Sequence, residues 1–154
     1  MRPLAAPLTL AMGLSVAAGC RSSAAVPAAL DPRTDTCATC RMVVSDARFA
    51  SQIVAPYEEP RFFDDLGCLA DYLRRTPTLP RGAVVFVADH RTRAWVLADR
   101  AVYTRVSGRT APMGSSIIAH ESPASRDADP DAAGGTPVDR RDVLPDVARP
   151  GGGR

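Results

Sequence analysis

The stretch Arg61-Phe62-Phe63-Asp64-Asp65-Leu66-Gly67-Cys68-Leu69-Ala70-Asp71-Tyr72-Leu73-Arg74-Arg75 predicts a short strand that runs directly into a helix. The paired aspartates are suited to the start of the helix, because carboxylates satisfy the free amides and complement the dipole there. Leucines and an alanine then recur at the 3.6-residue period and predict one buried face. The two arginines carry the charge that is favoured at a helix end, and prolines at positions 77 and 80 stop the helix.

Short strands are predicted on both sides of this helix. Residues 42–45 and 49–54 precede it, and the second of these segments alternates in the manner of a strand. Residues 83–88 follow it with consecutive apolar side chains, which is typical of a strand buried on both faces. We therefore expect a β-β-α-β unit.

A weaker copy of the pattern follows. Residues 94–99 and 101–105 resemble the two early strands, and residues 115–119 form another short strand. Ser122 with Pro123 can open a helix, and residues 136–144 predict a last edge strand. The predicted fold class is α+β: one small domain of two similar β-β-α-β units.

A cluster of sulfur ligands precedes the first unit, in Cys37-Ala38-Thr39-Cys40-Arg41-Met42. Residues two apart in a strand point to the same face, so Cys40 and Met42 can direct their sulfurs to one atom. Cys37 can join them if a tight turn precedes the strand. Thiolate and thioether ligands suit Cu(I). A C-x-x-C motif also serves zinc, redox chemistry and disulfides, and it is the nearby methionine that favours copper.

These sulfur residues also have simpler interpretations. Cys40 and Met42 can be buried packing residues, and Cys37 can form a disulfide with Cys40. Met113 lies in a Pro-Met-Gly turn, where an exposed methionine has little packing role, so we predict that it is a ligand from the second unit.

Three further side chains are weaker candidates. Cys68 lies close to the apolar stripe of the helix and is more simply a small buried residue than a ligand. His90 and His120 each stand alone at a strand end, where a histidine is usually a surface polar residue. Cys68 and His120 are retained as possible additional ligands.

The N-terminus resembles a bacterial export signal. A basic start is followed by an apolar run over residues 4–16, which is too short and too rich in alanine for a membrane span. Ala17-Ala18-Gly19-Cys20 resembles a lipoprotein box, in which Cys20 becomes the lipid-attachment site. An ordinary secretory signal cut near Ala18 is the alternative. Both place the mature chain outside the cytoplasm.

Four segments follow from this pattern. We predict a lipoprotein signal peptide over residues 1–19 and a flexible tether over residues 20–34, which is rich in serine, alanine and proline. A single folded domain spans residues 35–147, and residues 148–154 form a disordered tail.

Composition excludes some classes of function. The net charge is only +2, and every basic residue other than histidine is arginine, so nothing indicates the basic face of a nucleic-acid-binding protein. Four cysteines with one used for lipid leave three, and an odd number favours a metal site or a free thiol. Asp64 and Asp65 have no nucleophile beside them that would indicate a catalytic pair, so we expect no enzyme activity.

The order of motifs along the chain resembles the NosL family, the lipoprotein copper chaperones that accompany nitrous-oxide reductase. The motifs are Cys37-x-x-Cys40-x-Met42, Phe49-Ala50-Ser51-Gln52-Ile53, Phe63-Asp64-Asp65-Leu66-Gly67-Cys68, Tyr72-Leu73, Val87-x-Asp89, Trp95-x-x-Ala98, Ala101-x-Tyr103 and Thr110-x-Pro112-Met113-Gly114. The resemblance covers residues 35–119. It implies two β-β-α-β units and delivery of Cu(I) in the periplasm. Arg41 departs from the family, which usually has glycine between the cysteine and the methionine.

The leading hypothesis is a membrane-tethered Cu(I) carrier of the bacterial cell envelope, a periplasmic lipoprotein. Its ligands would be Cys40, Met42 and Met113, with Cys37. The resemblance implies nitrous-oxide reductase, or its maturation and ABC-transporter complex, as the recipient. One rival is a structural zinc module of Cys37, Cys40, Cys68 and a histidine. The other is a thiol-disulfide oxidoreductase, although that class places its first cysteine at a helix N-terminus.

Overall fold

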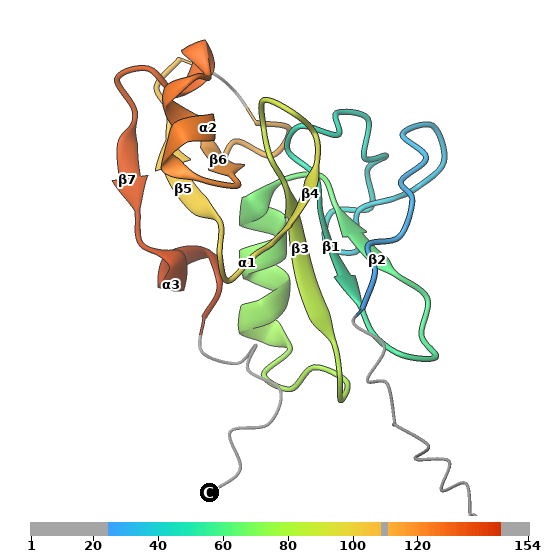
Figure 1. Ribbon diagram of the computed structural model, residues 1–154. Coiled ribbons are helices and arrows are strands. Elements are labelled where there is room, and N and C mark those ends of the chain that lie inside the picture. The colour runs from blue at the N-terminus through green and yellow to red at the C-terminus, as the bar shows by residue number, and fades with distance from the viewer. Residues whose placement is uncertain (1–24, 109–110, 146–154) are drawn as a thin grey trace, which may run out of the picture.

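The computed structural model describes residues 25–108 and 111–145 (Figure 1). The predicted signal peptide over residues 1–19, its lipid-attachment residue Cys20 and the predicted tail over residues 148–154 lie outside these residues. None of the described helices is long and apolar enough to cross a membrane.

The first sheet contains β2, the strand at the start of the stretch over residues 61–75. Its strands lie in the order β2 (Arg61–Phe63), β1 (Ser51–Val54), β3 (Val84–Ala88) and β4 (Trp95–Leu97), and all neighbours are antiparallel. Helix α1 (Leu66–Arg75) connects β2 to β3 and contacts strands of both sheets (Figure 1).

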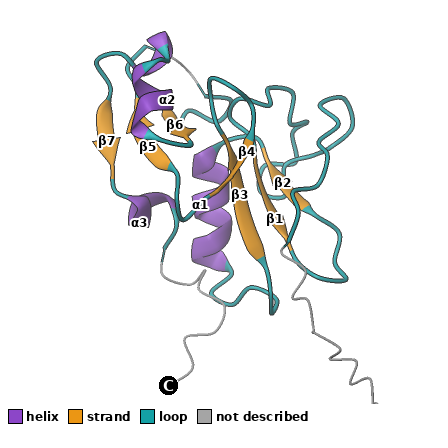
Figure 2. Ribbon diagram, in the orientation of Figure 1, coloured by secondary structure: helices purple, strands orange, loops and turns teal. Residues whose placement is uncertain are grey.

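The second sheet repeats this arrangement with one strand fewer and a shorter helix (Figure 2). Its order is β6 (Ile117–His120), β5 (Val102–Arg105) and β7 (Thr136–Val138), again antiparallel. Between β6 and β7 the chain forms α2 (Pro123–Asp127) and the 3₁₀ turn η1 (Pro130–Ala132). In both units the first strand is central, with the second strand on one side and the strand after the helix on the other. The prediction of an α+β fold with two β-β-α-β units is confirmed.

Three predicted strands differ in the structure. Trp95–Leu97 pairs with β3 and extends the first sheet, so the second unit begins at β5. Residues 42–45 form no strand, and Val43 makes only an isolated bridge to Thr36. A closed turn at Arg41 comes directly before this segment, and the Met42 and Val43 side chains are exposed. The predicted strand over residues 136–144 ends early, since Asp139 caps helix α3 (Arg140–Val143).

Helix α1 buries the face predicted for it. The Asp65 side chain accepts a hydrogen bond from the Gly67 amide at 2.5 Å, the interaction that the paired aspartates predict. Leu66, Leu69 and Leu73 are all buried. Burying a leucine stabilises a fold by roughly 1.5–3 kcal/mol, so this face accounts for much of the main core. That core also includes Phe63 and Ile53 of the first unit and Tyr103, Ala119 and Val143 of the second.

Asp65 also connects the two units. Its Oδ2 accepts hydrogen bonds from the amides of Met113 at 3.1 Å and Ser115 at 3.2 Å, on the loop before β6. The loop lies so close to α1 that a β-carbon added to Gly67 would be 3.0 Å from the β-carbon of Ser115. The methionine loop is thereby fixed to the start of α1.

A second buried aspartate makes the reciprocal connection. Asp89 follows β3, and its Oδ2 accepts hydrogen bonds from the Glu121 amide at 2.8 Å and the Ser125 hydroxyl at 2.7 Å, at the start of α2. Burial alone would raise the pKa of Asp89, but these hydrogen bonds, with those from Thr92, lower it well below its ordinary value. The starts of α1 and α2 are therefore each held by a carboxylate that connects the two units.

The end of the predicted tether contacts the domain. The Gln52 side chain, which is fully buried in β1, accepts from the Ala28 amide at 2.8 Å and donates to the Ala28 carbonyl at 3.1 Å. Leu30 packs against the main core. The composition of this segment predicted a flexible tether. At Ala28, however, the backbone is held by two hydrogen bonds to the side-chain amide of Gln52.

Candidate metal centre

A closed turn holds the C-x-x-C motif. The Cys37 amide donates to the Met42 carbonyl at 2.8 Å, and the Arg41 amide donates to the Cys37 carbonyl at 3.0 Å. Arg41 completes the turn with φ of 68°, in the left-handed region that favours glycine. The Cys40 amide also points to the Cys37 sulfur, at 3.5 Å. The tight turn required for Cys37 to join the site is therefore present.

Two hydrogen bonds dock this turn on the first unit. The Ala38 amide donates to the Phe62 carbonyl of β2 at 2.8 Å, and the Thr39 hydroxyl donates to the Cys68 carbonyl of α1 at 2.9 Å. Both partners lie beside the junction between β2 and α1. The motif is consequently placed over the start of the helix.

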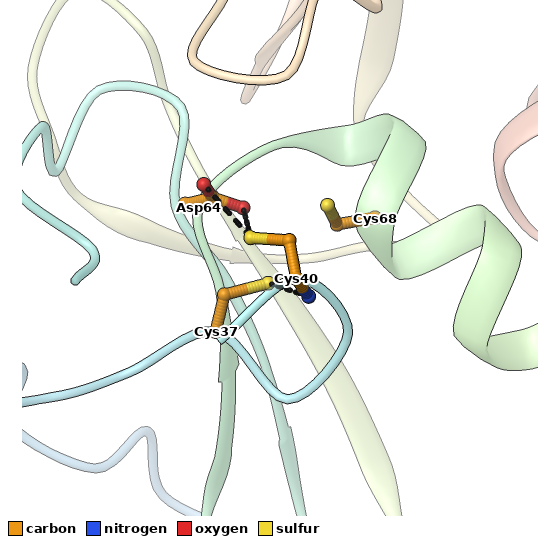
Figure 3. Close-up of side chains that lie close together, drawn as sticks. All are labelled: Cys37, Cys40, Asp64 and Cys68. Carbon is orange, nitrogen blue, oxygen red and sulfur yellow. Dashed lines mark hydrogen bonds between the residues drawn. The ribbon is translucent and has the colours of Figure 1, made fainter. Parts of the chain in front are cut away.

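The docking gathers three thiols and a carboxylate. One ligand atom from each of Cys37, Cys40, Cys68 and Asp64 lies within 4.8 Å of the other three (Figure 3). Cys37, Cys68 and Asp64 are buried, and Cys40 is half-buried. All three described cysteines are free thiols. We refer to these four residues as the cysteine group.

Two thiols of the cysteine group, those of Cys40 and Cys68, have raised pKa values. Burial raises the pKa of Cys40, and burial together with the nearby Cys37 and Asp64 raises that of Cys68 far above its ordinary value. The Cys40 thiol donates to the Asp64 carboxylate, with sulfur–oxygen distances of 3.4 and 3.5 Å. A metal ion must therefore displace protons to bind here, and Asp64 is the hydrogen-bond acceptor of the Cys40 thiol.

The donor set selects soft or borderline metals. Thiolates bind Cu(I) in sites of few ligands, and three thiolates with one carboxylate also complete a zinc tetrahedron. The cysteine group thus supplies the three sulfurs required by the zinc alternative, but its fourth donor is Asp64 and not a histidine.

The two methionines predicted as ligands lie on segments that border the cysteine group. Met42 directly follows the C-x-x-C turn, and Met113 is bound through its amide to Asp65, the neighbour of Asp64. Their side chains are 54% and 48% exposed. Each residue is about half exposed, so both methionines can be reached from the solvent.

The sequence did not indicate Asp64 as a member of this group, and Cys68 was predicted to be a small buried residue and kept as a possible additional ligand; it is buried and lies in the group. Two features of the stretch point to these residues. Asp65 is the helix cap, so Asp64 is not needed for that role, and Cys68 lies one helical turn beyond Asp64. Only the docking of the distant C-x-x-C turn gives them a common partner.

The histidines form a different group. His90 and His120 were expected to be isolated surface residues, but both are buried and contact the Asp129 carboxylate. The expectation was wrong because the strand ends that carry them face the interior between the two sheets. His120, a possible additional ligand, lies with His90 and Asp129 and not within the cysteine group.

Comparison with known proteins gives one match. The model of the NosL protein family matches residues 27–148, from the segment that Gln52 holds to beyond α3. No curated protein and no solved structure gives a significant match.

Proposed function

Since the chain belongs to the NosL family, which is associated with copper and with accessory roles outside the cytoplasm, we propose that it carries Cu(I) at the cysteine group. The observation on which this depends is the convergence of three free thiols within 4.8 Å of one another and of Asp64. Cu(I) prefers sulfur and is stable with two or three ligands.

The burial of the donors suggests how copper would be held and released. Cys37 and Cys68 are buried and would supply the inner thiolates, whereas half-buried Cys40 would face the arriving ion. The proton that Cu(I) displaces from Cys40 would pass by way of Asp64, its hydrogen-bond acceptor, to the solvent. Exposed Met42 and Met113 would bind the ion first and be exchanged for ligands of the recipient.

This role requires transfer of the ion without a chemical reaction, so we propose no catalytic activity. The family resemblance implies nitrous-oxide reductase, or its maturation and ABC-transporter complex, as the recipient. A carrier for such a recipient needs a site that is tight and yet accessible. The half-exposed methionines beside buried thiols provide that combination.

Copper preference is tested by direct competition. Reduced protein should take up about one Cu(I) per chain and release Zn(II) first when both are present with a chelator, because thioethers bind Cu(I) and hardly bind Zn(II). Cys40→Ala should abolish most of the Cu(I) affinity. Val43→Ala is a matched control, since it alters an exposed position next to the same turn without removing a sulfur. Zinc retained as strongly as copper would instead support the zinc alternative, because three thiolates and a carboxylate can also complete a zinc tetrahedron.

Anchoring is a separate part of the proposal. Cys20 would carry lipid chains, whose combined apolar burial makes membrane attachment stable. Full-length protein expressed in a bacterium should sediment with membranes and incorporate labelled lipid, and Cys20→Ser should do neither. Unlabelled wild-type protein in the soluble periplasmic fraction would remove the anchor without affecting the copper site.

A further inference from the structure

A second set of metal-binding side chains converges away from the cysteine group. His90 follows β3, His120 ends β6 and Asp129 lies between α2 and η1. The Oδ2 atom of Asp129 lies 2.7 Å from His90 Nδ1 and 2.9 Å from His120 Nε2. All three side chains are at least 95% buried, and these are the two histidines of the entire chain.

The protons of this group can be assigned. Burial raises the pKa of Asp129, but hydrogen bonds with His120 and His90 outweigh it, so the pKa lies below its ordinary value. An ionised carboxylate only accepts hydrogen bonds. Each ring therefore carries a proton on the nitrogen that faces Asp129.

The remaining ring nitrogens are not used by this arrangement. His90 Nε2 and His120 Nδ1 are buried and have no hydrogen-bond partner among the described residues. Buried polar atoms without a partner are uncommon. Here each is the second nitrogen of its ring, so it can carry the ring proton when the nitrogen that faces Asp129 binds an ion.

We propose that His90, His120 and Asp129 form a second metal site, which binds a divalent ion of borderline softness such as Zn²⁺ or Cu²⁺. Two imidazoles and a carboxylate are the donors that such ions prefer, whereas the sulfur of the cysteine group suits Cu(I). Ligands about 2.0–2.2 Å from a tetrahedral ion stand roughly 3.3 Å apart. The present contacts of 2.7 and 2.9 Å need to widen by only about half an ångström.

The binding step is balanced in protons. Each ring loses the proton on the nitrogen that faces Asp129 and takes one up on its other nitrogen, so the site releases no net proton. Two hydrogen bonds to Asp129 are exchanged for three bonds to the ion. The other nitrogens lose no partner, since they have none among the described residues. A cavity of about 380 Å³ is lined in part by Asp129 and Thr104.

The experiment uses ¹⁵N-histidine-labelled wild-type protein, in which the two imidazoles are the only labelled rings. The cysteine group is first filled with Cu(I), and Zn²⁺ is then titrated. We expect the His90 proton to move from Nδ1 to Nε2 and the His120 proton from Nε2 to Nδ1, in one transition. Asp129→Asn should weaken Zn²⁺ binding by more than about tenfold. Asp131→Asn, which removes a neighbouring carboxylate, should not.

Cu²⁺ provides a second arm, in which electron spin resonance should show coupling to two imidazole nitrogens. Imidazole signals unchanged by excess Zn²⁺, together with no nitrogen coupling from Cu²⁺, would overturn the proposal and leave a hydrogen-bonded bridge. If Asp129→Asn does not fold, His120→Gln should abolish the response of the single remaining imidazole. Failure of Cu(I) binding at the cysteine group changes none of these signals, so the two proposals are tested separately.

Discussion

The amide of Met113 donates a hydrogen bond to the Asp65 carboxylate, 3.1 Å away, and this contact joins the second unit to the start of α1. The residue that caps the helix thus also positions the methionine loop beside the cysteine group. Helix stability and the placement of a possible copper ligand depend on the same buried side chain.

Asp65→Ala should therefore destabilise the protein by about 2–4 kcal/mol, as a lost cap and the unpaired loop amides contribute together. Asp65→Asn keeps an acceptor oxygen and should lose less. Urea unfolding of the metal-free variants measures both effects. In Cu(I) titrations, Asp65→Asn and Met113→Leu should be non-additive, because both act on the same loop. Equal stability of wild type and Asp65→Ala would contradict this account.

The left-handed conformation of Arg41 gives a stabilising substitution. A non-glycine residue there costs on the order of 1 kcal/mol or more, and the greater freedom of glycine in the unfolded chain offsets part of the gain. Arg41→Gly should raise the free energy of unfolding by about 0.5–1 kcal/mol. Arg41→Ala removes the charge but not the strain and should give no gain. A similar gain from both variants would assign the effect to charge.

The stretch around α1 was predictable because its signals are local. The cap at Asp65, the leucine periodicity and the final arginines all act within one helix. Trp95–Leu97 was misplaced because three half-buried residues suit the edge of either sheet, and pairing with β3 is decided by contacts distant in sequence. The histidine group could not be predicted for the same reason. Asp129 lies 39 positions from His90 and 9 positions from His120 in the sequence.

The candidate site was predicted in part. The spacing of Cys37 and Cys40 indicated a metal-binding turn, and the turn exists. The assumption that a strand follows it was wrong, because Arg41 and Met42 belong to the exposed turn. Asp64 could not be identified by spacing, since it enters the group only when the turn docks on β2.

The low pKa of Asp89 predicts a loss of stability in acid. A carboxyl whose folded pKa lies below its unfolded value of about 3.9 stabilises the fold above that pH, and the contribution is lost as the pH falls below it. Asp89→Asn should cost about 2–4 kcal/mol at pH 7, because hydrogen bonds to a buried charge are lost. Urea unfolding should show a smaller difference from wild type near pH 3. If the difference in unfolding free energy between Asp89→Asn and wild type did not change with pH, the charge of Asp89 would not be its cause.

The protons on the thiols predict how Cu(I) binding depends on pH. Each thiol proton that the ion displaces below the thiol pKa makes the apparent affinity rise by about tenfold per pH unit. Because the pKa values of Cys40 and Cys68 are raised, this slope should persist across about pH 6–8. Substituting either Cys40 or Cys68 should weaken Cu(I) binding. It should also lower the slope of log affinity against pH by about one, because one thiol proton fewer is displaced.

Thioethers have no proton to lose, so the methionine variants separate ligand loss from proton loss. Met42→Leu and Met113→Leu should each weaken Cu(I) binding and keep the slope, since leucine is close in volume and spares the fold. Val43→Ala, at an exposed position beside Met42, is the matched control. Chelator competition across this pH range measures all the variants. Wild-type affinity and slope in Cys40→Ala would place the copper outside the cysteine group, whereas an unchanged affinity in both methionine variants would leave the thiols and Asp64 as the entire site.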